Sequence, residues 1–134
     1  GMGAWGPGTF ENDHALDWWG DLLEGEPGLV LDALQKVTNA EADAFLDADD
    51  CCEALAAAEL LAAATGRGRD RVPKDAGDWL DLHRVTLGAS EQALARVAVA
   101  RIEARSELQE LWDEGGRDEQ WHASLAELQT RLSG

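Results

Sequence analysis

Residues that form covalent cross-links or metal sites are scarce in this sequence. The 134 residues include two cysteines, three histidines and no tyrosine. The cysteines are adjacent, Cys51 and Cys52, and therefore lack the Cys-x-x-Cys spacing of zinc and redox motifs. We expect two reduced thiols inside a helix, with a strained vicinal disulfide as the alternative.

Positive charge is also scarce. The chain has 11 Lys and Arg residues against 27 Asp and Glu residues, a net charge of −16. Residues 1–65 hold 14 acidic residues and one basic residue, Lys36, whereas residues 66–134 hold 13 acidic and 10 basic residues. Such a field repels phosphate, which excludes nucleic acid as a partner. The acidic half either attracts a basic protein or only keeps the chain soluble and monomeric.

Long apolar runs are absent. No stretch approaches the roughly 20 apolar residues that cross a bilayer, and the N-terminus lacks the pattern of a secretory signal. We therefore expect a cytoplasmic protein that does not contact membranes. Gly1 precedes Met2 and is interpreted as a residue added for expression. The length predicts one domain over residues 2–134.

Helical periodicity fills most of the chain. Apolar residues recur with a helical period in residues 12–25, 26–38, 51–66, 73–85, 90–104 and 106–112, and again after Gly115 and Gly116. Strand-like alternation is absent. The sequence predicts an all-α fold, a single compact bundle of six to seven helices, with the alanine-rich residues 51–66 as its central element.

Local signals predict how these helices begin, end and pack. We expect a mobile surface loop over residues 66–73 and a second loop over residues 39–50, pinned by Phe45 and Leu46. The expected helix caps are Asn12 or Asp13, Asp49 or Asp50, and Ser106. Residues assigned to the apolar faces include Leu16, Trp19, Leu23, Trp79, Leu82, Val97, Ile102, Trp121, Leu125, Leu128 and Leu132.

Motifs for metal binding and catalysis are weak. Glu11 and His14, and again Glu119 and His122, have the Glu-x-x-His spacing of di-iron bundles. Those bundles also require a glutamate from a preceding helix, and we expect only a loop before Glu11. No nucleophile elbow or phosphate-binding loop is present. We therefore predict no metal, no cofactor and no assigned catalytic residue.

Glu59 is the polar residue in the least polar surroundings. Its neighbours on a helix would be Cys52, Leu55, Ala56, Ala62 and Ala63. The carboxylate must either reach solvent from the edge of the apolar face that these neighbours form or be buried with hydrogen-bond donors. If it is buried, the candidate donors are backbone N–H groups of the glycine-rich N-terminus, the indole of Trp5, and Arg101.

The chain opens with an unusual stretch, GAWGPGTFENDHALDWW. Gly3, Gly6 and Gly8 permit tight turns, while Trp5 and Phe10 supply apolar surface. We expect an ordered Gly/Trp-rich arm that packs on the helices, rather than a ligand-binding turn.

This opening, together with ALAAAELLAA, SELQELW and the spacing of Trp121, Leu125, Leu128 and Leu132, resembles the family of domain of unknown function 4259. The resemblance covers nearly the whole chain and implies a bacterial, single-domain protein. It implies no activity and no cofactor. His14 stands where that family more often has an acidic residue, which argues further against a metal site.

Two functional hypotheses follow. The first is a non-enzymatic acidic protein, a monomer or weak dimer, that binds a basic protein partner, for example as an immunity-type inhibitor of a toxin. The second is a small enzyme with a carboxylate site formed by Glu59 and the N-terminal motif. The candidate binding residues are Trp5, Gly6, Gly8, Phe10, Glu11, Asn12, Asp13, Asp17, Trp18 and Glu59.

Overall fold

The computed structural model describes residues 6–83 and 87–133, and these form seven α-helices and one 3-10 helix without any strand. This confirms the predicted all-α bundle. The elements are α1 (Asp13–Glu24), α2 (Leu29–Thr38), α3 (Ala48–Ala64), η1 (Arg69–Arg71), α4 (Ala76–Leu82), α5 (Ala89–Ala104), α6 (Glu107–Glu114) and α7 (Asp118–Leu132).

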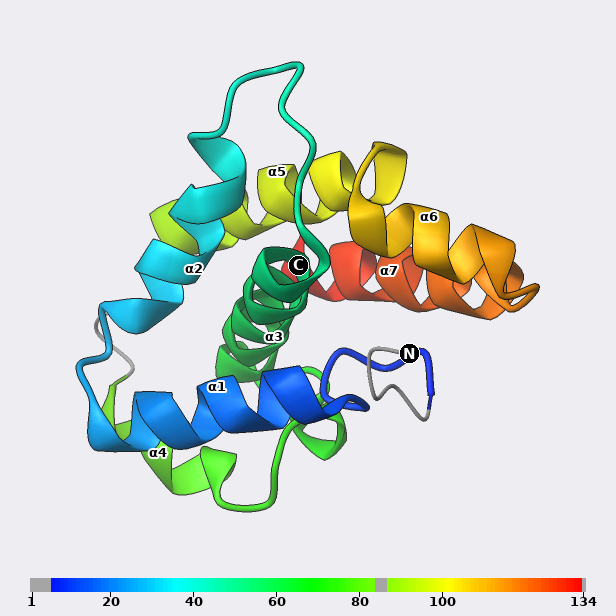
Figure 1. Cartoon of the computed structure of the whole chain (residues 1–134). Coiled ribbons are helices and arrows are strands. Elements are labelled where there is room, and N and C mark those ends of the chain that lie inside the picture. The colour runs from blue at the N-terminus through cyan, green and yellow to red at the C-terminus, as the bar shows by residue number, and fades with distance from the viewer. Residues whose placement is uncertain (1–5, 84–86, 134) are drawn as a thin grey trace.

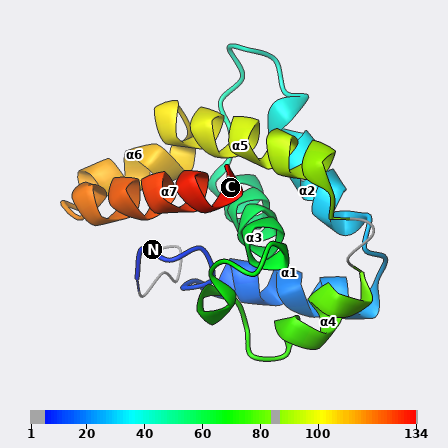
Figure 2. The ribbon, with the colours of Figure 1, turned by 180° about the vertical axis from the view of Figure 1, so that it is seen from behind.

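Helix α3 runs through the middle of the molecule and packs against every other α-helix (Figure 1). Of its 17 residues, 13 are buried and all of these except Glu59 are apolar or cysteine, so neighbouring elements cover most of the helix. Many of the buried residues are alanines, whose small side chains let the neighbouring helices approach closely. Figure 2 shows the same arrangement from behind, with α5 and α7 on one side of α3 and α1 and α4 on the other. The central position predicted for this segment is confirmed.

The helix starts follow the predicted chemistry with one correction. Asn12 caps α1 by accepting a hydrogen bond from the Ala15 N–H at 2.8 Å. Ser106 caps α6 by accepting one from the Gln109 N–H at 3.0 Å. The cap of α3 is Asp47, not Asp49 or Asp50, because the chain turns helical earlier and places those two residues in the first turn.

Several residues assigned to the core lie outside it. Helix α1 packs on α3 through Ala15, Trp18, Trp19 and Leu22, so its buried stripe is narrower than the sequence suggested. The two leucines that flank this stripe are exposed, and so are three other residues that the sequence predicts in apolar contacts. The exposed residues are Leu16, Leu23, Phe45, Leu82 and Val97.

The reasons for these exposures are local. Leu46 alone pins the loop before α3, and its neighbour Phe45 points away with 56% exposure. In α4 the buried residues are Ala76, Trp79 and Leu80, and Leu82, the last residue of the helix, is 79% exposed because it lies outside the face that they form. Leu46 also holds the loop through its carbonyl, which accepts a hydrogen bond from the Glu107 N–H at 2.9 Å.

The connection between α3 and α4, predicted as a surface loop, contains the short helix η1. Gly66 and Gly68 adopt φ angles of 90° and 86°, a region that favours glycine, and η1 follows. Arg69 donates to Asp81 at 3.0 Å, and Arg71 pairs with Glu127 at 2.8 Å. Ion pairs to two helices thus fix this basic segment to the bundle.

Among the described residues, no helix combines the length and apolar character that would carry it across a membrane.

Candidate functional site

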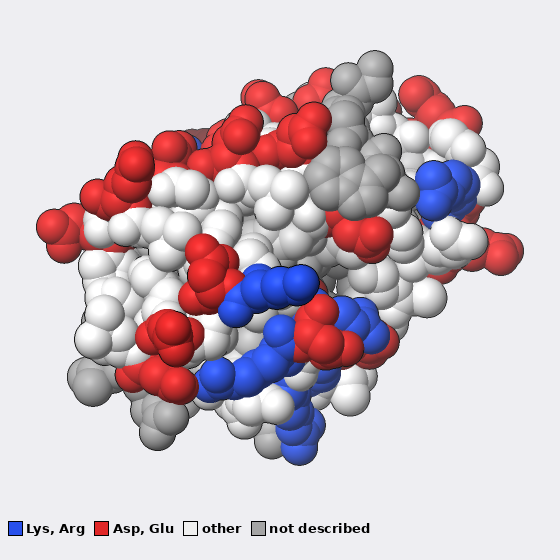
Figure 3. Space-filling view, turned by 90° about the horizontal axis from the view of Figure 1, so that it is seen from below, with Lys and Arg blue, Asp and Glu red and all other residues white. Residues whose placement is uncertain are grey.

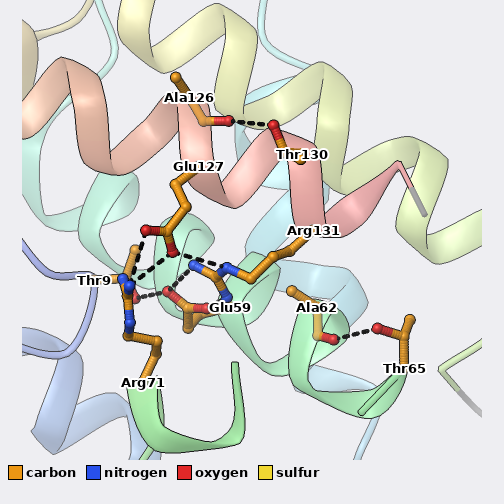
Figure 4. A network of polar contacts seen from close by, with 9 residues as sticks. All are labelled: Thr9, Glu59, Ala62, Thr65, Arg71, Ala126, Glu127, Thr130 and Arg131. Atoms are coloured by element: carbon orange, nitrogen blue, oxygen red, sulfur yellow. Dashed lines mark hydrogen bonds and ion pairs between the residues drawn. The ribbon is translucent and has the colours of Figure 1, made fainter. Parts of the chain in front are cut away.

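Glu59 is buried, with 3% of its surface exposed. The middle of α3 places its carboxylate against the N-terminal arm and α7 (Figure 4). The Thr9 hydroxyl donates to Glu59 Oε1 at 2.7 Å, and the Arg131 guanidinium donates to both carboxylate oxygens. Burial was one of the two alternatives that the sequence left open.

The contacts of Glu59 continue into a chain of ion pairs. Arg131 Nε donates to Glu127 at 3.1 Å, and Glu127 also accepts from Arg71. Burial alone would lower the pKa of Arg131, but its hydrogen bonds and charge interactions with Glu59 and Glu127 raise that pKa above its ordinary value. The network therefore joins the arm, α3, α7 and η1 through charged groups.

The donors to Glu59 differ from those that the sequence suggested. The Gly8 N–H donates to Glu11 Oε1 at 2.9 Å instead, and Arg101 donates to backbone carbonyls around the end of α2, including that of Val37 at 2.8 Å. Trp5 lies outside the described residues. Thr9 and Arg131 could not be predicted as partners of Glu59, because they are 50 and 72 residues away from it and no local pattern connects them.

The described part of the arm packs closely on the helices. Thr9 and Phe10 are 6% and 7% exposed, so the predicted burial of Phe10 is confirmed. Gly8 lies directly beside the Glu11 carboxylate, where an added Cβ would come within 2.5 Å of Oε1. The Glu11 carboxylate therefore closes the glycine turn, where it accepts a hydrogen bond from the Gly8 N–H.

A groove of about 450 Å³ opens beside Glu59, between the arm, α1 and the segment 70–73. Its polar lining consists of Thr9, Glu11, Glu59, Asp70 and Arg71, and its apolar lining includes Phe10, Leu16 and Val72. Asn12 and Asp17, the predicted partners of Glu59 in an enzymatic site, do not line this groove.

A second groove, of about 420 Å³, lies between α1, α2 and α3, and we call it the acidic groove. Asp17 and Asp21 come from α1, Asp32 from α2 and Glu53 from α3, while Trp18 and Leu29 give it an apolar wall. Asp17 and Trp18 were candidates from the sequence. Leu29, Asp32 and Glu53 were not, because the groove forms only when three helices pack together.

One cation, Lys36, lines the acidic groove. Its Nζ lies 3.4 Å from Glu53 Oε1 and 4.0 Å from Asp50 Oδ1. His14 Nε2 is 2.8 Å from Glu53 Oε2. Asp17, Asp21 and Asp32 form no ion pair with any residue that the structure describes, so three carboxylates of the groove have no internal counter-charge.

The surroundings of the acidic groove are negative as well. Burial, followed by the charge of Asp47, raises the pKa of Asp50, and Lys36 offsets this only in part. Figure 3 shows a row of acidic side chains along the upper edge of the face seen from below, while most Lys and Arg side chains in view lie lower down, beside further acidic side chains.

The histidines and cysteines form no metal site in the described part of the chain, where no cluster of three or more suitable side chains occurs. His122 instead lies 2.7 Å from Glu103 and 3.4 Å from Asp113. Cys51 and Cys52 are free and buried, and burial raises the pKa of each thiol to about 12. The expected reduced core thiols are confirmed.

The family model for a domain of unknown function (DUF4259) matches residues 3–124. The chain belongs to this family. The match includes the arm, α1 to α6 and the first half of α7, and it therefore contains both grooves. Among curated proteins, and likewise among solved structures, no match is found.

Proposed function

We propose that this DUF4259 protein is a non-enzymatic binding protein whose acidic groove holds a basic segment of a protein partner. The observation that supports this most strongly is the convergence of carboxylates from three helices on one concave surface with an apolar wall. Helix packing around α3 fixes that convergence, so the groove exists before any partner arrives. Preorganised charge of this kind reduces the ordering that binding requires.

The groove suits a lysine or arginine side chain. The aliphatic part of such a side chain would lie along Trp18 and Leu29, and its charged end would meet Asp17, Asp21 or Asp32. Among the described residues, no cation pairs with these three carboxylates, whereas Lys36 and His14 contact the fourth groove carboxylate, Glu53. The negative field of the first half of the chain would also accelerate encounter with a basic partner.

The alternative hypothesis, a small enzyme built on Glu59, fits the geometry less well. Thr9 and Arg131 occupy the carboxylate oxygens of Glu59, which supports a structural role. Asn12 is used as the cap of α1, and Asp17 belongs to the other groove. These three side chains therefore do not converge on one substrate.

An immunity-type inhibitor that neutralises a basic toxin in the bacterial cytoplasm is the specific form of binding protein that we propose. Such an inhibitor needs a preformed acidic surface and fast association, and the acidic groove would provide both.

The proposal is tested with a fluorescein-labelled peptide of alternating arginine and glycine. We expect fluorescence anisotropy to show binding at about 50 mM salt that weakens steeply at about 300 mM. Asp17→Asn with Asp21→Asn should weaken binding. Glu110→Gln with Glu114→Gln, which removes the same charge from exposed positions on α6, should affect it far less. Equal losses in the two variants would overturn the proposal.

Capture from a lysate of the native host then asks for the natural partner. The parent protein and the two variants serve as baits at both salt concentrations. We expect a basic protein that the parent and the α6 variant retain and the groove variant loses. Retention of the same proteins by all three baits would contradict a role for the acidic groove.

A further inference from the structure

Lys36 has an unusual position in the acidic half of the chain. It is the one basic residue among residues 1–65, and it lines the same groove as the unpaired carboxylates of α1 and α2. Its side chain is 52% exposed and its contacts with Glu53 and Asp50 are long, at 3.4 and 4.0 Å. Contacts of this length and exposure contribute little to stability, so Lys36 is held loosely.

We propose that Lys36 is an internal competitor that occupies part of the acidic groove and must move aside when a basic side chain of the partner enters. This inference rests on the proposed function and adds to it a residue that sets affinity and selectivity. The ammonium group of Lys36 supplies the same chemistry as the partner's lysine or arginine. It therefore shows which kind of ligand the groove accepts.

Asp50 could hold the displaced ammonium group. Asp50 does not line the groove, its side chain is 45% exposed, and its Oδ1 already lies 4.0 Å from Lys36 Nζ. A small rotation of the lysine side chain toward Asp50 would leave Glu53 to the partner. Because the pKa of Asp50 is raised by burial and neighbouring acidic groups, a closer cation would also relieve that carboxylate.

The competitor also affects which partner is selected. A lysine or arginine must displace Lys36 to reach Glu53, and arginine can offset this cost with two parallel hydrogen bonds to one carboxylate. A lysine forms a single point contact. The groove should therefore prefer arginine peptides to lysine peptides, and that preference should shrink when Lys36 is removed.

The test compares Lys36→Met with Lys74→Met in the anisotropy assay with the arginine–glycine peptide. Both changes remove one positive charge from an exposed lysine, but Lys74 does not line the acidic groove. We expect Lys36→Met to tighten binding by about fivefold or more, and Lys74→Met to change it by less than about twofold. Lys36→Arg should weaken binding relative to the parent, because its guanidinium can form two parallel hydrogen bonds to one groove carboxylate.

The outcomes separate this inference from the proposed function. If Asp17→Asn weakens binding but Lys36→Met and Lys74→Met have equal effects, the peptide binds in the acidic groove and Lys36 does not compete with it. Weaker binding by Lys36→Met would also overturn the inference, because Lys36 would then help to build the site. If the parent does not bind through the groove, both the proposed function and the inference fail.

Discussion

Replacing Arg131 with methionine removes the charged partner of a buried carboxylate. Glu59 is 3% exposed and would keep the Thr9 hydroxyl as its remaining donor among the described residues. Removing one member of a buried pair typically costs about 3–5 kcal/mol, because the other charge stays buried without compensation. Since the Arg131 side chain is itself 12% exposed, we expect a loss near the lower end, about 3 kcal/mol.

The reverse change should cost less. Glu59→Leu leaves Arg131 with Glu127 and partial access to solvent, so we expect a loss of about 1–3 kcal/mol. The double variant should lose less than the two single losses combined, because neither buried charge then remains. Arg71→Met is the matched control: its ion pair with Glu127 is exposed on both sides, and its loss should stay below about 1 kcal/mol.

Urea unfolding followed by tryptophan fluorescence measures all four variants. Arg131 does not stabilise buried Glu59 if Arg131→Met unfolds at the parent's urea midpoint, or if the losses for Glu59→Leu and Arg131→Met add fully in the double variant. Full additivity would mean that the two groups do not depend on each other in the folded state.

Three further predictions concern other parts of the chain. Gly68→Ala should destabilise the fold by about 1 kcal/mol or more in thermal unfolding, because Gly68 has a positive φ angle and lies beside Arg131. Gly20→Ala is the matched control: Gly20 lies in a helix with open space around it, so alanine should stabilise the fold by about 0.5–1 kcal/mol. Hydrogen bonds to carboxylates raise the pKa of His122, so protonated His122 stabilises the folded state. This contribution to the free energy of unfolding should be fully present below pH about 6.5 and decline as the pH rises through the folded-state pKa. The free energy of unfolding of His122→Gln, measured across pH 5–9, should lack this pH-dependent contribution. A thiol reagent at pH about 8 should leave Cys51 and Cys52 unmodified until the protein unfolds, since burial raises both pKa values to about 12.

The sequence predicted those features that depend on neighbouring residues. Helical periodicity located the helices, Asn12 and Ser106 were correct caps, and the apolar neighbours of Glu59 marked it as exceptional. These signals lie within one or two turns of a helix. Leu16 and Leu23 were wrongly assigned to the core because the width of a buried stripe depends on how α1 rests on α3.

The candidate sites depend on contacts between distant segments, and the sequence predicted them only in part. Thr9 and Arg131 meet at Glu59 from opposite ends of the chain, although nothing near either residue indicates it. The charge count revealed an acidic half, but the acidic groove requires α1, α2 and α3 to be packed before Asp17 and Asp32 face one space. Composition therefore predicted the sign of the surface and not its shape.

The most direct test of the central claim is a titration of the ¹⁵N-labelled protein with the arginine–glycine peptide, followed by amide chemical shifts. We expect shifts concentrated at Asp17, Trp18, Asp21 and Asp32, together with the Trp18 indole. These shifts should be lost in the variant Asp17→Asn with Asp21→Asn. Shifts spread evenly over all exposed acidic residues, including Glu110 and Glu114 on α6, would show that the peptide binds nonspecifically through net charge. That result would contradict a specific binding site in the acidic groove.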